Sequence, residues 1–300
     1  MPYRGRFAPS PTGQLHLGSL VAAVGSWLRA RHHEGVWLVR IEDLDPDREI
    51  ADAADEMIET LARFGMESDE PVVWQSKRGD RYQAALATLV ERGHAYRCPC
   101  SRSDLEPFGG IHPAHCVRTV DEESDAAWRV RVGNDQIEFD DIRLGRQASA
   151  LHEGGDFVVH RREGWAAYQL AVVVDDAAQG VTEVVRGADL LDSTPRQILV
   201  QRYLGLKQPD YLHLPIVFAH DGRKLSKQER ACPVDPNNPM PSLRAALETL
   251  GMPGITKATP RDALVAALHH PAWSNSAVGG TTVAGDAAMQ RELDASFRHT

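Results

Sequence analysis

Apolar residues recur at helical intervals in the first part of the chain. Residues 15–31 place them three or four positions apart, and Gly35 then precedes the segment 36–41, which is apolar except for Arg40. This pattern predicts an amphipathic helix that crosses over to a buried strand. The same spacing predicts helices near 51–64 and 80–92, each of which is followed by a glycine.

The helical spacing is interrupted in the middle of the chain by a stretch rich in Cys, Gly and Pro, which we interpret as an insertion. Two short strands are predicted inside it, and buried segments resume after it. The strands lie at 127–132 and 137–142, apolar runs follow at 156–160, 167–174 and 181–186, and a helix near 195–204 precedes a strand at 212–218. Helices alternating with buried strands are typical of doubly wound sheets.

These patterns predict an α/β fold built on a split Rossmann-type, doubly wound parallel sheet. Residues 1–95 and 152–230 form the two halves of the sheet, and residues 96–151 form the insertion between them. Residues 231–300 form a short helical segment that thins out into a tail.

Composition and charge narrow the class of protein. The 300 residues are 42% hydrophobic and 25% charged, as in ordinary globular proteins. A net charge of -9 excludes the bulk positive charge of a nonspecific nucleic-acid binder, so any RNA contact needs a local basic patch. The basic segments 1–41 and 196–230 are candidates for one anion-binding surface. No apolar run approaches the ~20 residues of a membrane helix, so we expect a cytoplasmic protein without membrane contact.

Three of the four cysteines lie close together inside the insertion. Cys98 and Cys100 precede His112 and Cys116, and this density of soft and borderline ligands favours tetrahedral zinc over a disulfide framework. We therefore predict a structural zinc site, with His112 as the fourth ligand and His115 as the alternative.

The segment Arg6-Phe-Ala-Pro-Ser-Pro-Thr-Gly-Gln-Leu-His-Leu-Gly-Ser19 carries the strongest chemical signal. Its prolines and Gly13 indicate a turn that leads directly into the first predicted helix. His16 and Gly18 then lie at the helix N-terminus, where free amides and the positive dipole end attract phosphate. Taken alone, the segment also fits an ordinary turn that caps a helix.

A second polar loop, His220-Asp-Gly-Arg-Lys-Leu-Ser-Lys-Gln228, places two lysines three residues apart. Mobile lysines suit a migrating negative charge, although such a loop is by itself usually a solvated surface. Together with the opening Pro-Ser-Pro-Thr-Gly-x-x-His-x-Gly, it resembles the two signature motifs of class I aminoacyl-tRNA synthetases. Leu225 and Gln228 depart from the usual loop, but neither removes a charged group.

The resemblance narrows to the catalytic domain of glutamyl-tRNA synthetases and runs over most of residues 4–250. It implies that the amino acid is surrounded by Arg6, Ala8, Ser10, Glu42, Tyr168 and Arg186. The chemistry agrees, because glutamate presents an ammonium that Glu42 can pair and two carboxylates that need a guanidinium such as Arg186 or Arg6. Without that context, the less favoured alternatives are a helix-capping acid for Glu42 and a surface ion pair for Arg186.

The resemblance also implies ATP, with Mg²⁺, as the second substrate. A glutamate carboxylate attacks the α-phosphate and pyrophosphate leaves, so the protein must bring anions together and stabilise charge. The implied catalytic residues are His16, Gly18, Lys224 and Lys227. The implied ATP-binding residues are Pro9, Thr12, Gly13, His16, Gly18, Ser19 and Lys227.

Only residues 229–300 follow the lysine loop, so we expect no anticodon-binding domain. With the early cysteine cluster, this resembles the glutamyl-queuosine tRNA(Asp) synthetase group, whose zinc site has tyrosine at the position of His112. The resemblance implies a monomer that activates L-glutamate without tRNA and transfers it to queuosine in the anticodon loop of tRNA(Asp). The alternatives are a truncated synthetase that charges tRNA(Glu) and a noncatalytic RNA-binding paralogue.

Overall fold

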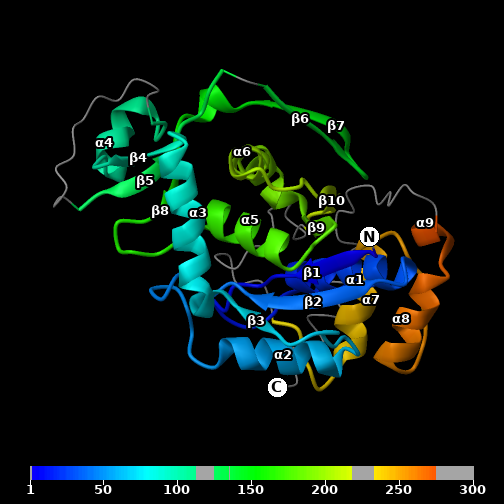
Figure 1. The fold of residues 1–300 in the computed structure, drawn as a ribbon. Coiled ribbons are helices and arrows are strands. Elements are labelled where there is room, and N and C mark those ends of the chain that lie inside the picture. The colour runs from blue at the N-terminus through cyan, green and yellow to red at the C-terminus, as the bar shows by residue number, and fades with distance from the viewer. Residues whose placement is uncertain (1, 113–124, 135, 218–232, 275–300) are drawn as a thin grey trace.

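The structure is a computed structural model that describes residues 2–112, 125–134, 136–217 and 233–274. Figure 1 shows its α/β architecture, in which helices lie on both sides of a central sheet and a smaller sheet lies beside it.

Three parallel strands come from the N-terminal part of the chain. They are β1 (Arg4–Phe7), β2 (Val36–Ile41) and β3 (Val73–Trp74), with β2 in the middle. The connections are α1 (Leu17–His32) and α2 (Ala53–Arg63), and α3 (Gly79–Glu91) follows β3. The predicted helices and the strand at 36–41 are confirmed. The short strand β1 was not predicted, because arginines occupy two of its four positions and it therefore shows no apolar run.

The second group of strands has the order β7-β6-β10-β9. Their bounds are β6 (Gln136–Asp141), β7 (Gly145–Ala150), β9 (Glu183–Gly187) and β10 (Asp210–Leu214). β9 lies beside β1, where Thr182 N donates to Arg4 O at 2.9 Å. The two groups therefore continue one another across the molecule, as expected for a doubly wound fold that is split by an insertion.

The prediction of an all-parallel sheet is wrong at its edge. β6 and β10 are parallel, but β7 runs antiparallel to β6. The cause is local: Asp141 Oδ1 accepts hydrogen bonds from the amides of Arg143 and Leu144, and this turn reverses the chain directly after β6. The sheet is therefore mixed.

A small antiparallel sheet lies beside the main one. It consists of β4 (Ala95–Cys98), β5 (Ala127–Val130) and β8 (Phe157–His160), with β5 in the middle. The short helix α4 (Arg102–Leu105) follows β4. Residues 96–151 thus contribute β5 and most of β4 to this sheet, and β6 and β7 to the main one. The division of the chain into four regions stays a prediction.

The remaining helices are α5 (Tyr168–Ala178), α6 (Thr194–Leu204), α7 (Pro239–Thr249), α8 (Pro260–Leu268) and α9 (Pro271–Ser274). The apolar run at 167–174 thus lies in a helix, whereas the strand expected at 212–218 already ends at Leu214. α7 and α8 pack against α1, and their apolar side chains join those of α1, β1 and β2 in one core. No helix within the described ranges is long and apolar enough to cross a membrane.

Candidate active site

A cavity of about 430 Å³ lies where β1, β2, β9 and β10 end. The carboxyl ends of parallel strands are where open α/β sheets bind ligands. All six predicted glutamate-binding residues line the cavity. Of the predicted ATP-binding residues, Pro9, Thr12, His16, Gly18 and Ser19 also line it, whereas Gly13 is absent from its wall and turns the chain with a φ of 130°.

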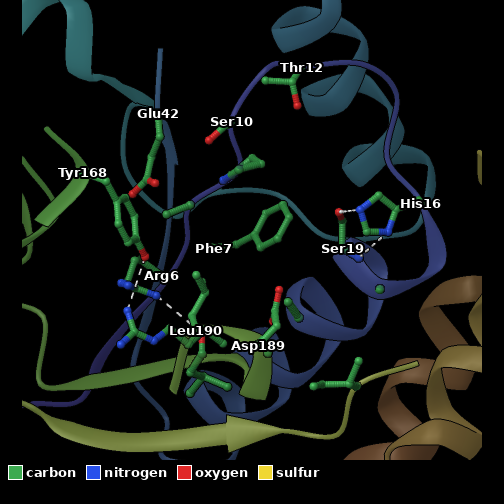
Figure 2. A pocket seen from close by; sticks show the side chains of 18 of the residues that line it. Arg6, Phe7, Ser10, Thr12, His16, Ser19, Glu42, Tyr168, Asp189 and Leu190 are labelled. Carbon is green, nitrogen blue, oxygen red and sulfur yellow. Dashed lines mark hydrogen bonds between the residues drawn. The ribbon is translucent and has the colours of Figure 1, made fainter. Parts of the chain in front are cut away.

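The cavity has two chemically different ends. Figure 2 shows Glu42, Tyr168 and Arg6 gathered at one end, His16 and Ser19 at the other, and Phe7 between them. One space therefore brings together the charged residues predicted for the amino acid and the helix N-terminus predicted for phosphate.

Arg6 is already paired within the protein. Its Nε and Nη2 donate to Asp176 on α5 at 3.0 and 3.3 Å, and both side chains are buried. Asp176 also accepts from Arg40 Nη1 at 2.7 Å. Burial alone would raise the pKa of the Asp176 carboxyl, but Arg6 and Arg40 outweigh it and lower the pKa below its ordinary value. The positive charge of Arg6 is thus matched before any ligand arrives.

Glu42 faces the same end of the cavity directly after β2. Its Oε1 accepts from Arg40 Nη2 at 3.2 Å, a longer contact than the 2.7 Å between Arg40 Nη1 and Asp176. Burial raises the pKa of the Glu42 carboxyl, and the neighbouring Arg40 and Arg6 only partly offset it. Arg40 is shared with Asp176, so Glu42 is incompletely compensated and suits a cationic ligand such as an ammonium group.

Arg186 differs from Arg6 because none of its described partners is an acid. Nη1 donates to Gln197 Oε1 at 2.8 Å and to Tyr168 Oη at 3.3 Å, while Nη2 donates to Thr194 Oγ1 at 2.7 Å. Nε donates to His213 Nε2 at 3.1 Å. Arg186 is only 4% exposed. A buried guanidinium with neutral partners carries an unmatched charge, which an anionic ligand would pair.

His16 and Gly18 are brought together for a reason that the sequence did not indicate. His16 caps α1: its Nδ1 accepts from Ser19 N at 3.2 Å, and its ring lies over the first turn. A Cβ on Gly18 would lie 3.1 Å from the His16 ring. Glycine therefore allows the imidazole to fold back over the helix N-terminus. Contacts of either residue with a nucleotide stay a prediction.

Lys224 and Lys227 lie outside the described residues, and their roles stay predictions. The described residues on either side of 218–232 do border the site. Val217 lines the cavity, and Val234 N donates to Leu15 O at 2.9 Å, next to His16.

The cysteine cluster forms a separate centre in the small sheet. Cys98, Cys100 and His112 are buried, and their ligand atoms all lie within 4.8 Å of one another. Two thiols and an imidazole at this separation fit a tetrahedral zinc ion that takes one further ligand. Cys116 and the alternative ligand His115 lie outside the described residues. The metal, the coordination of Cys116 and the choice of His112 over His115 therefore stay predictions.

Two residues that the sequence did not single out orient His112. Tyr96 Oη donates to Asp156 Oδ2 at 2.6 Å and lies 3.3 Å from His112 Nδ1. Because the tyrosine proton is given to Asp156, the tyrosine oxygen accepts from Nδ1, and this leaves His112 Nε2 free of its proton. Nε2 faces the cysteines, 3.1 Å from Cys98 Sγ.

Segment 1–41 carries less uncompensated positive charge than its sequence indicates, and its contact with an anion stays a prediction. Each of its arginines pairs with an acid from another segment, so little positive charge is left for a polyanion. The pairs are Arg4 with Glu70, Arg6 and Arg40 with Asp176, Arg29 with Glu183, and Arg31 with Asp69.

Comparison with known proteins identifies the class to which this fold and site belong. Residues 3–240 match the family model of the catalytic domain of class I tRNA synthetases (E and Q), and the chain belongs to that family. It is 55% identical over 253 residues to the glutamyl-Q tRNA(Asp) synthetase of Xanthomonas campestris pv. campestris (strain 8004), covering 84% of each chain. It is 46% identical over 292 residues to the protein of that name from Pseudomonas putida, covering 96% of this chain and 97% of the relative. The chain belongs to the glutamyl-Q tRNA(Asp) synthetase family and is an ATP-dependent ligase.

A solved structure supports the fold and the predicted resemblance. The chain is similar to a glutamate tRNA ligase from Elizabethkingia meningosepticum in complex with its amino acid, with a TM-score of 0.69 and 27% identity. The match covers 77% of this chain and 53% of that one, so this chain spans about half the length of that ligase.

Proposed function

We propose that this protein activates L-glutamate with ATP, without tRNA, and transfers the glutamyl group to queuosine in the anticodon loop of tRNA(Asp). The observation that supports glutamate as the amino acid is that one cavity contains two opposite charges, each incompletely compensated by the protein. Arg186 is a buried guanidinium with neutral partners, and Glu42 is a buried acid whose pKa burial raises. A ligand with carboxylates and an ammonium group matches both.

The other end of the cavity suits the nucleotide. His16, Gly18 and Ser19 place the N-terminus of α1 at the wall, where backbone amides and the helix dipole favour phosphate. A glutamate held near Arg186 and an ATP held near α1 would share one space, so the carboxylate can approach the α-phosphate. Lys224, Lys227 and Mg²⁺ complete this proposal as the groups that stabilise charge on the phosphates.

The two metals have different roles in the proposal. Mg²⁺ accompanies ATP, whereas zinc holds the small sheet together through Cys98, Cys100, His112 and Cys116. We place the protein in the cytoplasm, where ATP, glutamate and tRNA are available, and we propose that it acts as a monomer.

The acceptor is the most specific part of the proposal. The relatives from Xanthomonas and Pseudomonas are named for queuosine and tRNA(Asp), and they match along most of the chain. The diol of queuosine offers a hydroxyl that can attack the adenylate carbonyl, forming an ester and releasing AMP.

Amino-acid-dependent ATP–pyrophosphate exchange tests the activation step. In the absence of tRNA, we expect exchange with L-glutamate and little with L-glutamine, which lacks the second carboxylate. No exchange with any amino acid would favour the noncatalytic paralogue. Exchange that appears only after tRNA(Glu) is added would favour a truncated glutamyl-tRNA synthetase.

A further inference from the structure

Two buried side chains, His213 and Asp141, continue the hydrogen-bond network from Arg186. His213 lies on β10, directly opposite Arg186 on β9, and its other ring nitrogen, Nδ1, is 2.7 Å from Asp141 Oδ2 on β6. His213 is fully buried, and Asp141 is 3% exposed. Three neighbouring strands therefore supply the row Asp141, His213, Arg186.

The chemistry of the three groups fixes the direction of each hydrogen bond. A guanidinium only donates and a carboxylate ion only accepts, so His213 donates from Nδ1 to Asp141 and accepts at Nε2 from Arg186 Nε. Asp141 is itself held in place, because Oδ1 accepts two backbone amides and Oδ2 accepts the amide of His213 at 3.0 Å. This arrangement requires a neutral imidazole with its proton on Nδ1.

The surroundings of His213 favour the neutral form. The charged groups that face it are Asp141 on β6, Arg186 on β9, and Arg143, whose Nε donates to the His213 carbonyl. Thr194 Oγ1 lies 3.1 Å from Nε2, and the ring of Tyr211 stacks at 6.2 Å between centroids. Burial lowers the pKa of the His213 imidazole, and the two arginines act in the same direction against Asp141. The pKa of the Asp141 carboxyl lies below its ordinary value, because the hydrogen bonds it accepts outweigh its burial.

The contrast with Arg6 shows what a neutral partner achieves. Arg6 is fixed by Asp176, and its charge is matched by that acid. Arg186 is fixed at Nε by His213, at Nη1 by Gln197 and at Nη2 by Thr194, and none of these carries a negative charge. Its guanidinium is thus held in one orientation while its charge stays unmatched.

We propose that His213 is a positioning residue for substrate recognition: held by Asp141, it accepts Arg186 Nε–H and presents the guanidinium to a carboxylate of glutamate. This inference rests on the proposed function and deepens it. Because the imidazole is neutral, it orients Arg186 without neutralising the guanidinium charge, which stays available to the ligand. Asp141 acts one step further back by fixing the imidazole tautomer.

Two substitutions separate the two sides of the ring. In H213Q the amide oxygen reaches the position of Nε2 and still accepts from Arg186, whereas in H213N the amide nitrogen takes the place of Nδ1 and donates only to Asp141. The glutamate KM and the ATP KM are measured by ATP–pyrophosphate exchange at pH 7.5, and thermal unfolding monitors the fold. We expect H213Q to keep the glutamate KM within about threefold of wild type and H213N to raise it about tenfold or more. The ATP KM and kcat should change by less than about threefold in both.

D141N provides a second test that leaves Arg186 and His213 in place. Without the ionised acceptor the imidazole is free to change tautomer, so the glutamate KM should rise several-fold with little change in the ATP KM. The pH profile adds a third readout. Burial and the two arginines hold the pKa of the His213 imidazole below its ordinary value of 6.5, so the ring is protonated only in more acidic solution. Protonation there removes its acceptor and places two cations together, so toward acid the glutamate KM should rise more steeply in wild type than in H213Q.

Three results would overturn the inference. The first is a glutamate KM in H213N that is no higher than in H213Q. The second is a glutamate KM in D141N equal to that of wild type. The third is an equal rise of the glutamate and ATP KM values in H213N or D141N, which indicates general damage to the site. If wild type shows glutamate-dependent exchange, any of these results overturns this inference but leaves the proposed function standing. A wild type without glutamate-dependent exchange overturns the proposed function, and this inference with it.

Discussion

Arg6 on β1 and Asp176 on α5 form a buried two-point ion pair between segments 170 residues apart in the chain. It joins the two halves of the split sheet directly beneath the cavity, and Arg40 shares the same carboxylate. The acid therefore holds the fold together and also sets the charge of the site, because it matches Arg6 and leaves Arg186 as the unmatched guanidinium.

D176N should destabilise the protein strongly. Removing the acid leaves Arg6 buried without a negative partner, which costs about 3–5 kcal/mol for a pair of this kind. Urea unfolding near pH 7 measures the change in the free energy of unfolding. D140N is the matched control, because Asp140 pairs with Arg146 at the surface of the β6–β7 hairpin and its loss should change stability little.

The same ion pair predicts a pH dependence of stability. The pKa of Asp176 is lower in the folded protein than in the unfolded chain, so its stabilising effect is present above the ordinary value of 3.8. It is lost as the pH falls through the lower, folded value. The difference in unfolding free energy between wild type and D176N should therefore shrink in acid. A constant difference from pH 7 to pH 3 would contradict this assignment.

The helical spacing and the signature segments made much of this site predictable. The helices at 15–31, 51–64 and 80–92 were readable because their apolar positions repeat locally. Motif residues such as Glu42 and Arg186 were readable because ligand chemistry fixes their type.

The residues that hold the motif arginines in place were not predictable from the spacing of apolar positions. Asp176 and His213 meet the motif arginines only through strand pairing and helix packing over long sequence separations. One signal was available in retrospect: Asp175-Asp176 places two acids at buried positions of a helix, where charges occur only with partners. The antiparallel β7 was missed because a local turn at Asp141, and no periodic pattern, sets its direction.

E42Q and R186Q should each abolish most glutamate activation. Each change removes one of the two charges that pair with the ligand, and an effect of at least about 100-fold on kcat/KM for glutamate corresponds to about 2.7 kcal/mol. Exchange kinetics measure this, with R146Q, at the exposed hairpin, as the control. R186K tests geometry, because an ammonium cannot reproduce the three-point anchoring of the guanidinium. Near-normal kinetics in both E42Q and R186Q would show that glutamate binds elsewhere.

H112A should lose the bound metal. Elemental analysis of the purified protein should give about one zinc per chain in wild type and much less in H112A. Y96F should retain zinc but release it faster to a chelator, because Tyr96 orients the imidazole. H115A is the matched control and should resemble wild type. Loss of zinc in H115A, with full retention in H112A, would reverse the ligand assignment.

Gly155 tests the link between the small sheet and the metal site. It has a φ of 66°, and a Cβ there would collide with the carbonyl oxygen of His112. G155A should therefore displace His112 and lower the zinc content. It should also lower the free energy of unfolding by about 1–3 kcal/mol. G154A is the control next to it, because its Cβ would meet only the flexible end of Arg196 at 3.3 Å. Equal zinc content in the two variants would argue against the arrangement described for His112.

The central claim concerns the acceptor, and transfer of radiolabelled glutamate tests it most directly. The assay compares tRNA(Asp) carrying queuosine, the same tRNA without the modification, and tRNA(Glu), each with ATP and Mg²⁺. We predict labelling of the queuosine-modified tRNA(Asp) alone, with the label lost after periodate cleavage of the queuosine diol before the reaction. Equal labelling of modified and unmodified tRNA(Asp), or labelling of tRNA(Glu) at its 3′ end, would contradict the account.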